Sequence, residues 1–403
     1  MEHPTTWSVG HWLMWRYRVC PGSPNDFFEE RRSRHRMRRT LLSVSVRGGR
    51  TRTAAAYPRT PCGHPLIDVS PLLHGGDATL TVKHLRAALE QCGYFYAANV
   101  DVLPESYIRS IYDYSQRCHA LPSAIKEKYK QRGGTGVYSG PDIGQVELQY
   151  EANGPPATVR GWDYSRVRFT LAADSTQASH RCDVHSDPRY PTASELYPPF
   201  APTLDELYAR QNVLAVALLA GFERALELPP RTLRDMFDQG EGDFGTIRLL
   251  HYPGDATAAA NSTGIGAHTD FECFTLMHQD AHGLQLMPRR PGGGHGDWID
   301  APVREAEFIV IVGDMLERLT NGTLLATPHR VLPTTHERSS IIRFNAFAPE
   351  TLIEPLPRFV TAGSPRAYSS GMMPIDGPPR ATNYLMNSDL MMPLISPNAG
   401  ALI

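Results

Sequence analysis

One glycine-flanked stretch contains side chains with the types and spacing of a metal site. His268 and Asp270 lie two residues apart within Gly266-Ala267-His268-Thr269-Asp270-Phe271. If this stretch is a strand, both side chains point to the same face, because side chains alternate across a strand. An imidazole nitrogen and a carboxylate oxygen on one face can bind one divalent cation. A second histidine would complete the 2-His-1-carboxylate set that is typical of non-haem Fe(II).

A candidate for that second histidine lies about 60 residues further on. His329 follows Pro328 and precedes a predicted strand, and Pro328 favours extended backbone at Thr327. The chain also contains a second pair with the same spacing, His185-Ser186-Asp187, with Pro188 directly after it. This second pair lies in a segment rich in Ser, Asp and Pro. We expect a solvent-exposed loop there rather than a metal site.

An anion-binding pair follows the second histidine. Arg338 and Ser340 share one face if Arg338-Ser339-Ser340 is extended. A guanidinium binds a carboxylate through two hydrogen bonds, and the serine can add another. Together with a metal triad, this pair suits a 2-oxo acid. One end of such a molecule chelates the metal through its carboxylate and keto oxygens, and Arg338 holds the far carboxylate.

Composition limits the class of protein. The chain has 403 residues, of which 41% are hydrophobic and 20% are charged, as in a soluble globular protein. Its longest strongly apolar run, Val213 to Phe222, is half of the roughly 20 residues that a membrane span needs. Six scattered cysteines argue against a disulfide framework or a thiolate zinc site and for a reducing compartment.

Residues 1–62 differ from the rest of the chain. Ten arginines and no acid lie between Arg31 and Ile67, so the remainder carries about −2 − 10 = −12 charges and shows no nucleic-acid footprint. This composition is typical of an organellar transit peptide, although four acids precede the basic run. We hypothesise that translation begins at Met37. A disordered extension of a cytoplasmic protein is the equal alternative to mitochondrial targeting, and a nucleic-acid-binding arm is a weaker one.

The remaining chain is expected to divide into four parts. Residues 63–200 form an N-terminal region, 201–240 a connecting helix, 241–350 a β-rich core and 351–403 a C-terminal tail. Short strands separated by Gly, Asn and Pro turns after residue 242 argue for a sandwich or jelly roll. The predicted helices are 81–92, 107–114, 122–129 and 204–228; the predicted strands are 65–69, 94–97, 246–252, 273–278, 283–287, 308–312, 329–332 and 340–347; and 132–156 is predicted to be a loop.

At these residues the chain resembles the isopenicillin N synthase-like family of Fe(II)/2-oxoglutarate-dependent dioxygenases. The resemblance extends over roughly residues 64–360. It is carried by Gly266–Asp270, Gln279-Asp280, Gly283–Leu286, Gly313–Leu316, Thr320-Asn321-Gly322 and Thr327–Val331, and in the N-terminal region by Pro65–Val69, Gly93–Tyr96 and Leu121-Pro122 with Lys126.

The resemblance implies a mainly β fold with flanking helices, in which a double-stranded β-helix, or jelly roll, forms the core. It implies His268, Asp270 and His329 as Fe(2+) ligands, Arg338 and Ser340 as the anchor of 2-oxoglutarate, and Tyr252 as a further contact of that cosubstrate. The implied reaction uses O2, with ascorbate as an accessory reductant. It oxidises a small-molecule substrate, by default through hydroxylation, and yields succinate and CO2. We expect a monomer with no nucleic-acid or membrane partner.

Two departures and three alternatives remain at this point. Leu250 replaces an asparagine that is frequent in the family, and Arg343 stands where a proline is common. We predict that Arg343 points outward to solvent, with an inward position toward an anionic substrate as the alternative. The function alternatives are an isopenicillin N synthase-type or ethylene-forming-type oxidase that works without 2-oxoglutarate, a non-catalytic binding protein on the same scaffold, and a zinc hydrolase. The zinc hydrolase lacks support because no His-Glu-x-x-His motif is present.

Overall fold

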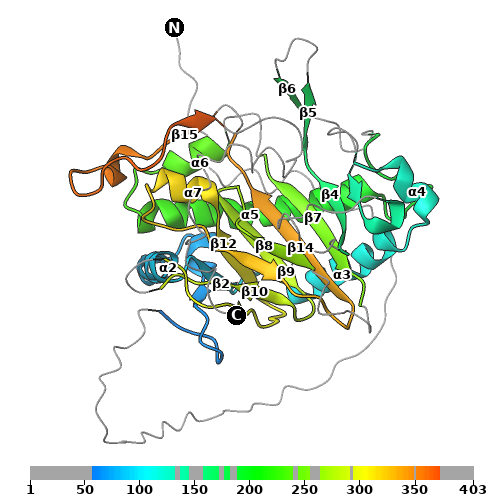
Figure 1. The fold of residues 1–403 in the computed structure, drawn as a ribbon, viewed down its shortest axis with the longest axis horizontal. Helices are drawn as coiled ribbons and strands as arrows, with labels where there is room; N and C mark the ends of the chain where they lie inside the picture. The colour runs from blue at the N-terminus through cyan, green and yellow to red at the C-terminus, as the bar shows by residue number, and fades with distance from the viewer. Residues whose placement is uncertain are drawn as a thin grey trace, which may run out of the picture. The chain divides into compact units, whose positions relative to one another are not determined.

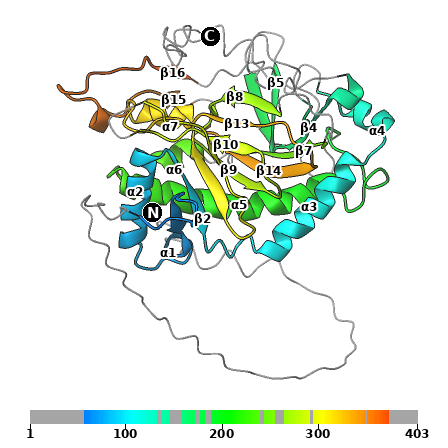
Figure 2. The same ribbon diagram turned by 60° about the horizontal axis from the view of Figure 1, so that its bottom comes forward.

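Two β-sheets form the centre of the fold (Figures 1 and 2). In the computed structural model, the larger sheet has the strand order β1-β2-β12-β9-β14-β7-β4-β3, and the smaller sheet has the order β11-β10-β13-β8. Only β1 and β2 pair in parallel among the described strands of these sheets. The larger sheet contains β1 (Leu66–Asp68), β2 (Tyr94–Ala98), β3 (Tyr138–Ser139), β4 (Arg160–Tyr164), β7 (Thr246–Tyr252), β9 (Phe274–Gln279), β12 (Phe308–Val312) and β14 (Arg338–Asn345), and the smaller sheet contains β8 (Ile265–His268), β10 (Leu284–Leu286), β11 (Ile299–Asp300) and β13 (His329–Val331).

The structure describes residues 57–131, 137–144, 158–171, 177–181, 188–238, 244–254, 264–290, 294–348 and 351–372. All of them belong to the second of two units, 1–53 and 54–403, into which the chain divides. Four predictions fall partly or wholly outside these ranges: the basic extension, the second His-x-Asp at 185–187, most of the loop at 132–156, and the C-terminal tail beyond residue 372. The domain boundaries stay predictions.

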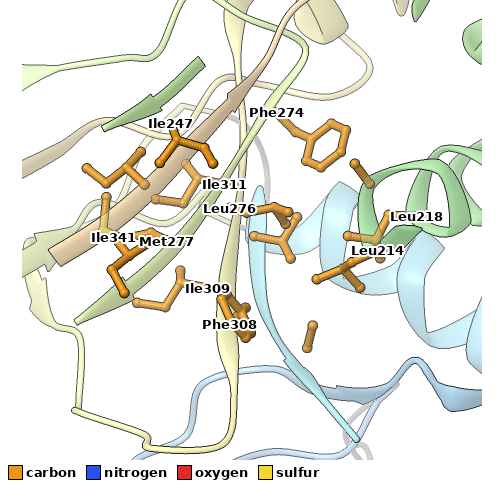
Figure 3. Packing of buried hydrophobic residues seen from close by; sticks show 14 of the residues in the cluster. Leu214, Leu218, Ile247, Phe274, Leu276, Met277, Phe308, Ile309, Ile311 and Ile341 are labelled. Atoms are coloured by element: carbon orange, nitrogen blue, oxygen red, sulfur yellow. The ribbon is translucent and has the colours of Figure 1, made fainter. Parts of the chain in front are cut away.

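One long helix supports the larger sheet from behind. Helix α5 (Phe200–Ala225) packs along one face of the sheet, and Leu214 and Leu218 lie next to Phe274 and Leu276 of β9 (Figure 3). All four side chains are fully buried. This face is therefore closed to solvent. The other helices are α1 (Ser70–Leu73), α2 (Thr79–Gln91), α3 (Glu105–His119), α4 (Ser123–Lys128), α6 (Thr232–Phe237) and α7 (Asp314–Leu319).

The predicted jelly-roll fold is confirmed, and the sequence missed an edge of the larger sheet. Strand β4 pairs with β7, and β3 pairs with β4, so part of the predicted loop at 132–156 contributes a strand. Two further two-stranded sheets also escaped prediction: β5 (Val167–Leu171) with β6 (Gln177–Arg181), and β15 (Leu352–Ile353) with β16 (Gly371–Met372).

The predicted outward position of Arg343 is wrong. Its side chain is fully buried against α5, where it donates hydrogen bonds to the Tyr208 carbonyl, 3.3 Å away, to Asn212 Oδ1 and to Asn345 Oδ1. The guanidinium also lies 4.0 Å from the centre of the Tyr208 ring. Alternation along β14 did place Arg343 opposite its neighbours, but the opposite face is covered by a helix instead of solvent. Arg343 does not point toward the interior of the barrel either.

Candidate metal and cosubstrate site

The three predicted metal ligands meet at one point between the two sheets. His329 begins β13, and its cross-strand partner on β8 is His268. Asp270 Oδ1 lies 3.7 Å from His268 Nε2 and 3.5 Å from His329 Nε2. Metal–nitrogen bonds of about 2.1 Å at right angles would place donor atoms about 3 Å apart. The three donor atoms could therefore close around one ion with shifts of less than about 1 Å.

Both histidines are oriented for metal binding by their other ring nitrogen. His268 Nδ1 lies 2.9 Å from the Gly266 carbonyl oxygen, and His329 Nδ1 lies 3.1 Å from the Thr327 carbonyl oxygen. Since a carbonyl only accepts, each Nδ1 carries the proton, and each Nε2 presents a lone pair toward Asp270. Burial, followed by the nearby His329, lowers the pKa of His268 to about 4, which keeps this ring neutral at pH 7.

Asp270 is positioned by a turn and not, as predicted, by a strand. Strand β8 ends at His268, so Asp270 lies in the turn that follows, and strand alternation does not place its carboxylate. Instead, the start of α7 holds the turn: the Asp314 amide donates to the Asp270 carbonyl at 2.8 Å. Thr275 donates its hydroxyl to Asp270 Oδ2, which leaves Oδ1 toward the histidines. A side chain at Gly313 would meet the Glu272 carbonyl at 2.1 Å, so only glycine allows this approach.

His329 is positioned from the N-terminal region. Gly93 ends α2 with φ of +79°, a conformation that favours glycine. Its carbonyl accepts the Thr327 hydroxyl at 2.8 Å, and a side chain at Gly93 would approach that hydroxyl oxygen to 2.4 Å. The Thr327 carbonyl in turn accepts the His329 Nδ1 proton. The glycine that follows the predicted helix 81–92 thus orients a predicted metal ligand more than 200 residues away.

Acidic groups concentrate around the triad. Burial and the charge of Asp270 raise the pKa of Glu272 to about 8. Burial raises the pKa of Asp314 to about 7, with further contributions from Glu317 and Asp270. Crowded, buried carboxyls raise each other's pKa values because ionising them together without a counter-charge is costly. A divalent cation on the triad would offset this cost, so the donor set fits Fe(II).

A buried cation with unfilled hydrogen-bonding capacity lies on the same interior. Arg338 is 1% exposed, and its only hydrogen bond within the described residues runs from Nη2 to Gln279 Oε1 at 3.0 Å. Its Nε and Nη1 are buried without a partner there, as is Ser340 Oγ. A buried charge with unpaired donors costs several kcal/mol unless an anion completes it. Arg338 and Ser340 therefore fit the carboxylate of a bound diacid.

Tyr252 borders this anion site. It pairs with Arg338 across β7 and β14, and the guanidinium lies 4.6 Å from the centre of its ring. Leu250, where many family members have asparagine, pairs with Ser340 on the same interior face and is buried. The next residue on that face, Arg248, is not among the predicted site residues. The alternation 248, 250, 252 could have revealed it.

Two family profiles match the chain. The 2OG-Fe(II) oxygenase superfamily matches residues 244–346, which include all six predicted site residues. The second profile, described as the N-terminal region of non-haem dioxygenases in morphine synthesis, matches residues 64–155.

Curated relatives span most of the same length. The homoarginine-6-hydroxylase 2-ODD-C23 of Glycine max is 28% identical over 309 residues, covering 72% of this chain and 88% of the relative. The 2-oxoglutarate-Fe(II) type oxidoreductase hxnY of Emericella nidulans is 28% identical over 341 residues, covering 76% and 86%. Codeine O-demethylase of Papaver somniferum is 28% identical, covering 76% and 78%.

Solved structures share the fold. A full-length Neurospora crassa protein in complex with alpha-KG superposes with a TM-score of 0.63 at 24% identity, covering 79% of this chain and 96% of that protein. The rice dioxygenase for auxin oxidation superposes with a TM-score of 0.59 at 20% identity, covering 81% and 95%.

Fold and site together define a non-haem iron oxygenase. The chain belongs to the 2OG-Fe(II) oxygenase superfamily and is an Fe(II)/2-oxoglutarate-dependent dioxygenase. Membership of this family implies Fe(2+), 2-oxoglutarate and O2 as the cofactor, cosubstrate and oxidant, as predicted from the sequence.

Proposed function

We propose that this dioxygenase hydroxylates a small organic substrate and releases succinate and CO2 as co-products. The observation that carries the proposal is that Arg338 Nε, Arg338 Nη1 and Ser340 Oγ are buried without a partner among the described residues, on the same interior as the His268–Asp270–His329 cluster. These donors fit a carboxylate, and oxidases that work without 2-oxoglutarate hold other carboxylates with similar residues, so the release of succinate has to separate the two.

Each side chain then has a defined task. His268, Asp270 and His329 hold Fe(II) through two neutral imidazoles and one carboxylate, and Thr275 keeps Asp270 Oδ1 aimed at the ion. Arg338 and Ser340 bind the distal carboxylate of 2-oxoglutarate, with Tyr252 alongside. When bound, Fe(II) and 2-oxoglutarate together activate O2 for attack on a C–H bond. The buried walls around the triad exclude water and orient the reacting groups.

The decisive experiment is an anaerobic titration of the purified protein with Fe(II) and 2-oxoglutarate. We expect a visible charge-transfer band in the native protein and in a His282→Ala control, since His282 is exposed. The band should be absent from a His329→Ala variant. If His329→Ala retained the band, the ligand assignment would be wrong.

A second measurement tests the reaction class. Aerobic turnover should consume O2 and release one succinate per 2-oxoglutarate decarboxylated. Substrate turnover without succinate would instead identify an oxidase of the isopenicillin N synthase or ethylene-forming type. Binding of both cofactors without succinate or product would identify a non-catalytic protein.

We further propose that the protein acts as a monomer on a small molecule. Among the described residues, no helix combines the length and the hydrophobicity that crossing a membrane requires. Size-exclusion chromatography with light scattering tests the monomer, and a dimer would contradict it. Cytoplasmic location, mitochondrial targeting and the start at Met37 stay predictions, which mass spectrometry of the native N-terminus tests. A peptide from residues 1–36 would exclude the start at Met37.

A further inference from the structure

An ion pair faces the interior of the barrel, away from the anion site. Arg248 on β7 and Asp163 on β4 are cross-strand partners. Arg248 Nε donates to Asp163 Oδ1 at 2.7 Å, and Nη2 donates to Asp163 Oδ2 at 2.9 Å. Gln131 Nε2 also donates to Asp163 Oδ2, at 2.8 Å. The arrangement is a forked salt bridge with an amide beside it.

The register of the sheet places this pair relative to the cosubstrate. Arg248 shares a face of β7 with Leu250 and Tyr252, and Tyr252 is the partner of Arg338. Four residues of strand separate Arg248 from Tyr252, a distance of about 13 Å. A five-carbon diacid held by Arg338 and by the triad has a partner for each of its carboxylates without Arg248. The proposed function therefore gives the Arg248–Asp163 pair no task.

The pair is nevertheless close to the metal site. The charge of Arg248 contributes to the lowered pKa of His268 and acts on Glu272. Its guanidinium lies 5.8 Å from the centre of the Phe344 ring, and Phe344 pairs with Thr275, the residue that holds Asp270. The Arg248–Asp163 pair thus lies on the β4 side of the interior, next to the triad.

Partial exposure distinguishes this pair from the cosubstrate anchor. The side chains of Arg248 and Asp163 are 21% and 16% exposed, although they point into the barrel. Arg338 on the same face is 1% exposed. This exposure makes both side chains accessible to a molecule that approaches the barrel interior from solvent, and the ring of Phe344 lies beside them.

We infer that Arg248 and Asp163 form the polar wall that recognises the prime substrate, and that this substrate is an uncharged molecule with an amide-like edge. The inference rests on the proposed function, because it assumes that Fe(II) and 2-oxoglutarate occupy the triad and the Arg338 end. A carbonyl oxygen of the substrate faces the guanidinium, and an adjacent N–H or O–H group donates to Asp163.

Charge balance selects the substrate class. Arg248 and Asp163 neutralise each other, so this pair carries no net charge by itself. A carboxylate substrate would be attracted by Arg248 but repelled by Asp163, and an ammonium substrate the reverse, so neither ion gains net attraction, whereas an uncharged amide can bind to both groups. A carboxylate has about four acceptor positions, and Asp163 uses three in hydrogen bonds within the described residues. The fourth position suits a donor next to a carbonyl group. The alternative is that the pair only joins β4 to β7.

Three probes with one ring and different charges test this inference: benzamide, benzoate and benzylammonium. Each is titrated into the anaerobic protein loaded with Fe(II) and 2-oxoglutarate, with the shift of the visible band as the readout. Benzamide should bind the native protein more tightly than the two ions. Arg248→Gln should weaken benzamide binding by roughly tenfold or more, the effect of losing a hydrogen bond to a charged group.

Two further variants separate recognition from structure. Arg166→Gln is a matched control, because Arg166 also forms an ion pair with an aspartate, at 2.6 Å from Asp205 and with 20% exposure, but outside the sheets. It should leave benzamide affinity unchanged. Asp163→Asn removes the repelling carboxylate and should increase benzoate affinity by about tenfold, a gain that a purely structural pair does not produce.

The outcomes are distinguishable. Equal or tighter binding of either ion to the native protein, no binding of any probe, or equal effects of Arg248→Gln and Arg166→Gln would overturn the inference. If Arg248→Gln fails to fold, the test relies on Asp163→Asn. An unchanged benzoate affinity in that variant would then overturn the inference. If the native protein forms no band with Fe(II) and 2-oxoglutarate, the proposed function fails first, and this inference falls with it.

Discussion

Replacing Arg338 by methionine should separate cosubstrate binding from folding. The substitution removes the buried charge but keeps a side chain of similar length. In the native protein two guanidinium nitrogens, Nε and Nη1, have no partner within the described residues and are available to the distal carboxylate of 2-oxoglutarate. Two hydrogen bonds between charged groups contribute about 3–6 kcal/mol. Arg338→Met should therefore weaken 2-oxoglutarate binding by about 10²–10⁴-fold.

The same substitution should cost little stability when 2-oxoglutarate is absent. A buried charge without a counter-ion opposes folding, and replacing such groups by apolar ones is neutral or stabilising by up to about 4 kcal/mol. We expect the free energy of unfolding of Arg338→Met to equal or exceed that of the native protein. Urea titration measures it. Adding 2-oxoglutarate at 100 times its Kd should stabilise the native protein by about 2.7 kcal/mol and the variant hardly at all.

Arg343→Met is the matched control. Arg343 lies five residues away in the same strand and is equally buried, but its guanidinium donates three hydrogen bonds. Its removal leaves those acceptors unpaired and should lower the free energy of unfolding by about 3 kcal/mol or more, with 2-oxoglutarate affinity unchanged in the folded fraction. If Arg338→Met kept native 2-oxoglutarate affinity, or if it destabilised the protein as much as Arg343→Met, the assignment of Arg338 would be refuted.

Three further predictions concern the metal, pH and the core. Thr275→Val removes the hydrogen bond to Asp270 Oδ2 and should weaken Fe(II) binding by about 10–100-fold in an equilibrium titration; unchanged affinity would show that Thr275 does not orient the ligand. Since burial lowers the pKa of His268 from 6.5 to about 4, the unfolded state binds this proton more tightly, and the free energy of unfolding of the metal-free protein should fall as pH decreases from 6.5 toward 4. A His268→Gln variant with the same pH dependence would exclude this histidine as the cause. Leu218→Ala should destabilise the protein by about 2–5 kcal/mol in urea, and a loss below about 1 kcal/mol would contradict the packing of α5 on the sheet.

Local patterns in the sequence were enough to name the residues of the candidate site. Residue types and spacings identified His268 and Asp270 and indicated His329, and the family resemblance implied the full ligand set with Arg338 and Ser340. Strand β7 was predicted with its observed bounds, because Thr246–Tyr252 is a short apolar run between turn residues. Arg338 and Ser340 do share a face, since strand alternation acts over two residues and needs no tertiary contact.

Features that depend on which element covers a face of the sheet were predicted less well. Arg343 was assigned to solvent because a charged residue opposite a buried face usually meets water, but α5 lies there and supplies acceptors. Strand β3 escaped prediction because its two residues carry almost no periodic signal and pair with β4, a strand that was not predicted either.

By itself, the sequence determined which residues could bind a metal and a carboxylate, because those properties belong to the side chains. Only the tertiary structure decided how they meet. Asp270 is held by the start of α7 and by Thr275, and His329 is held through Thr327 and Gly93, contacts between segments far apart in the chain. The structure also placed Arg248 and Asp163 across from each other in the interior, 85 residues apart in sequence. Such pairings arise from strand register, which depends on the packing of the whole sheet.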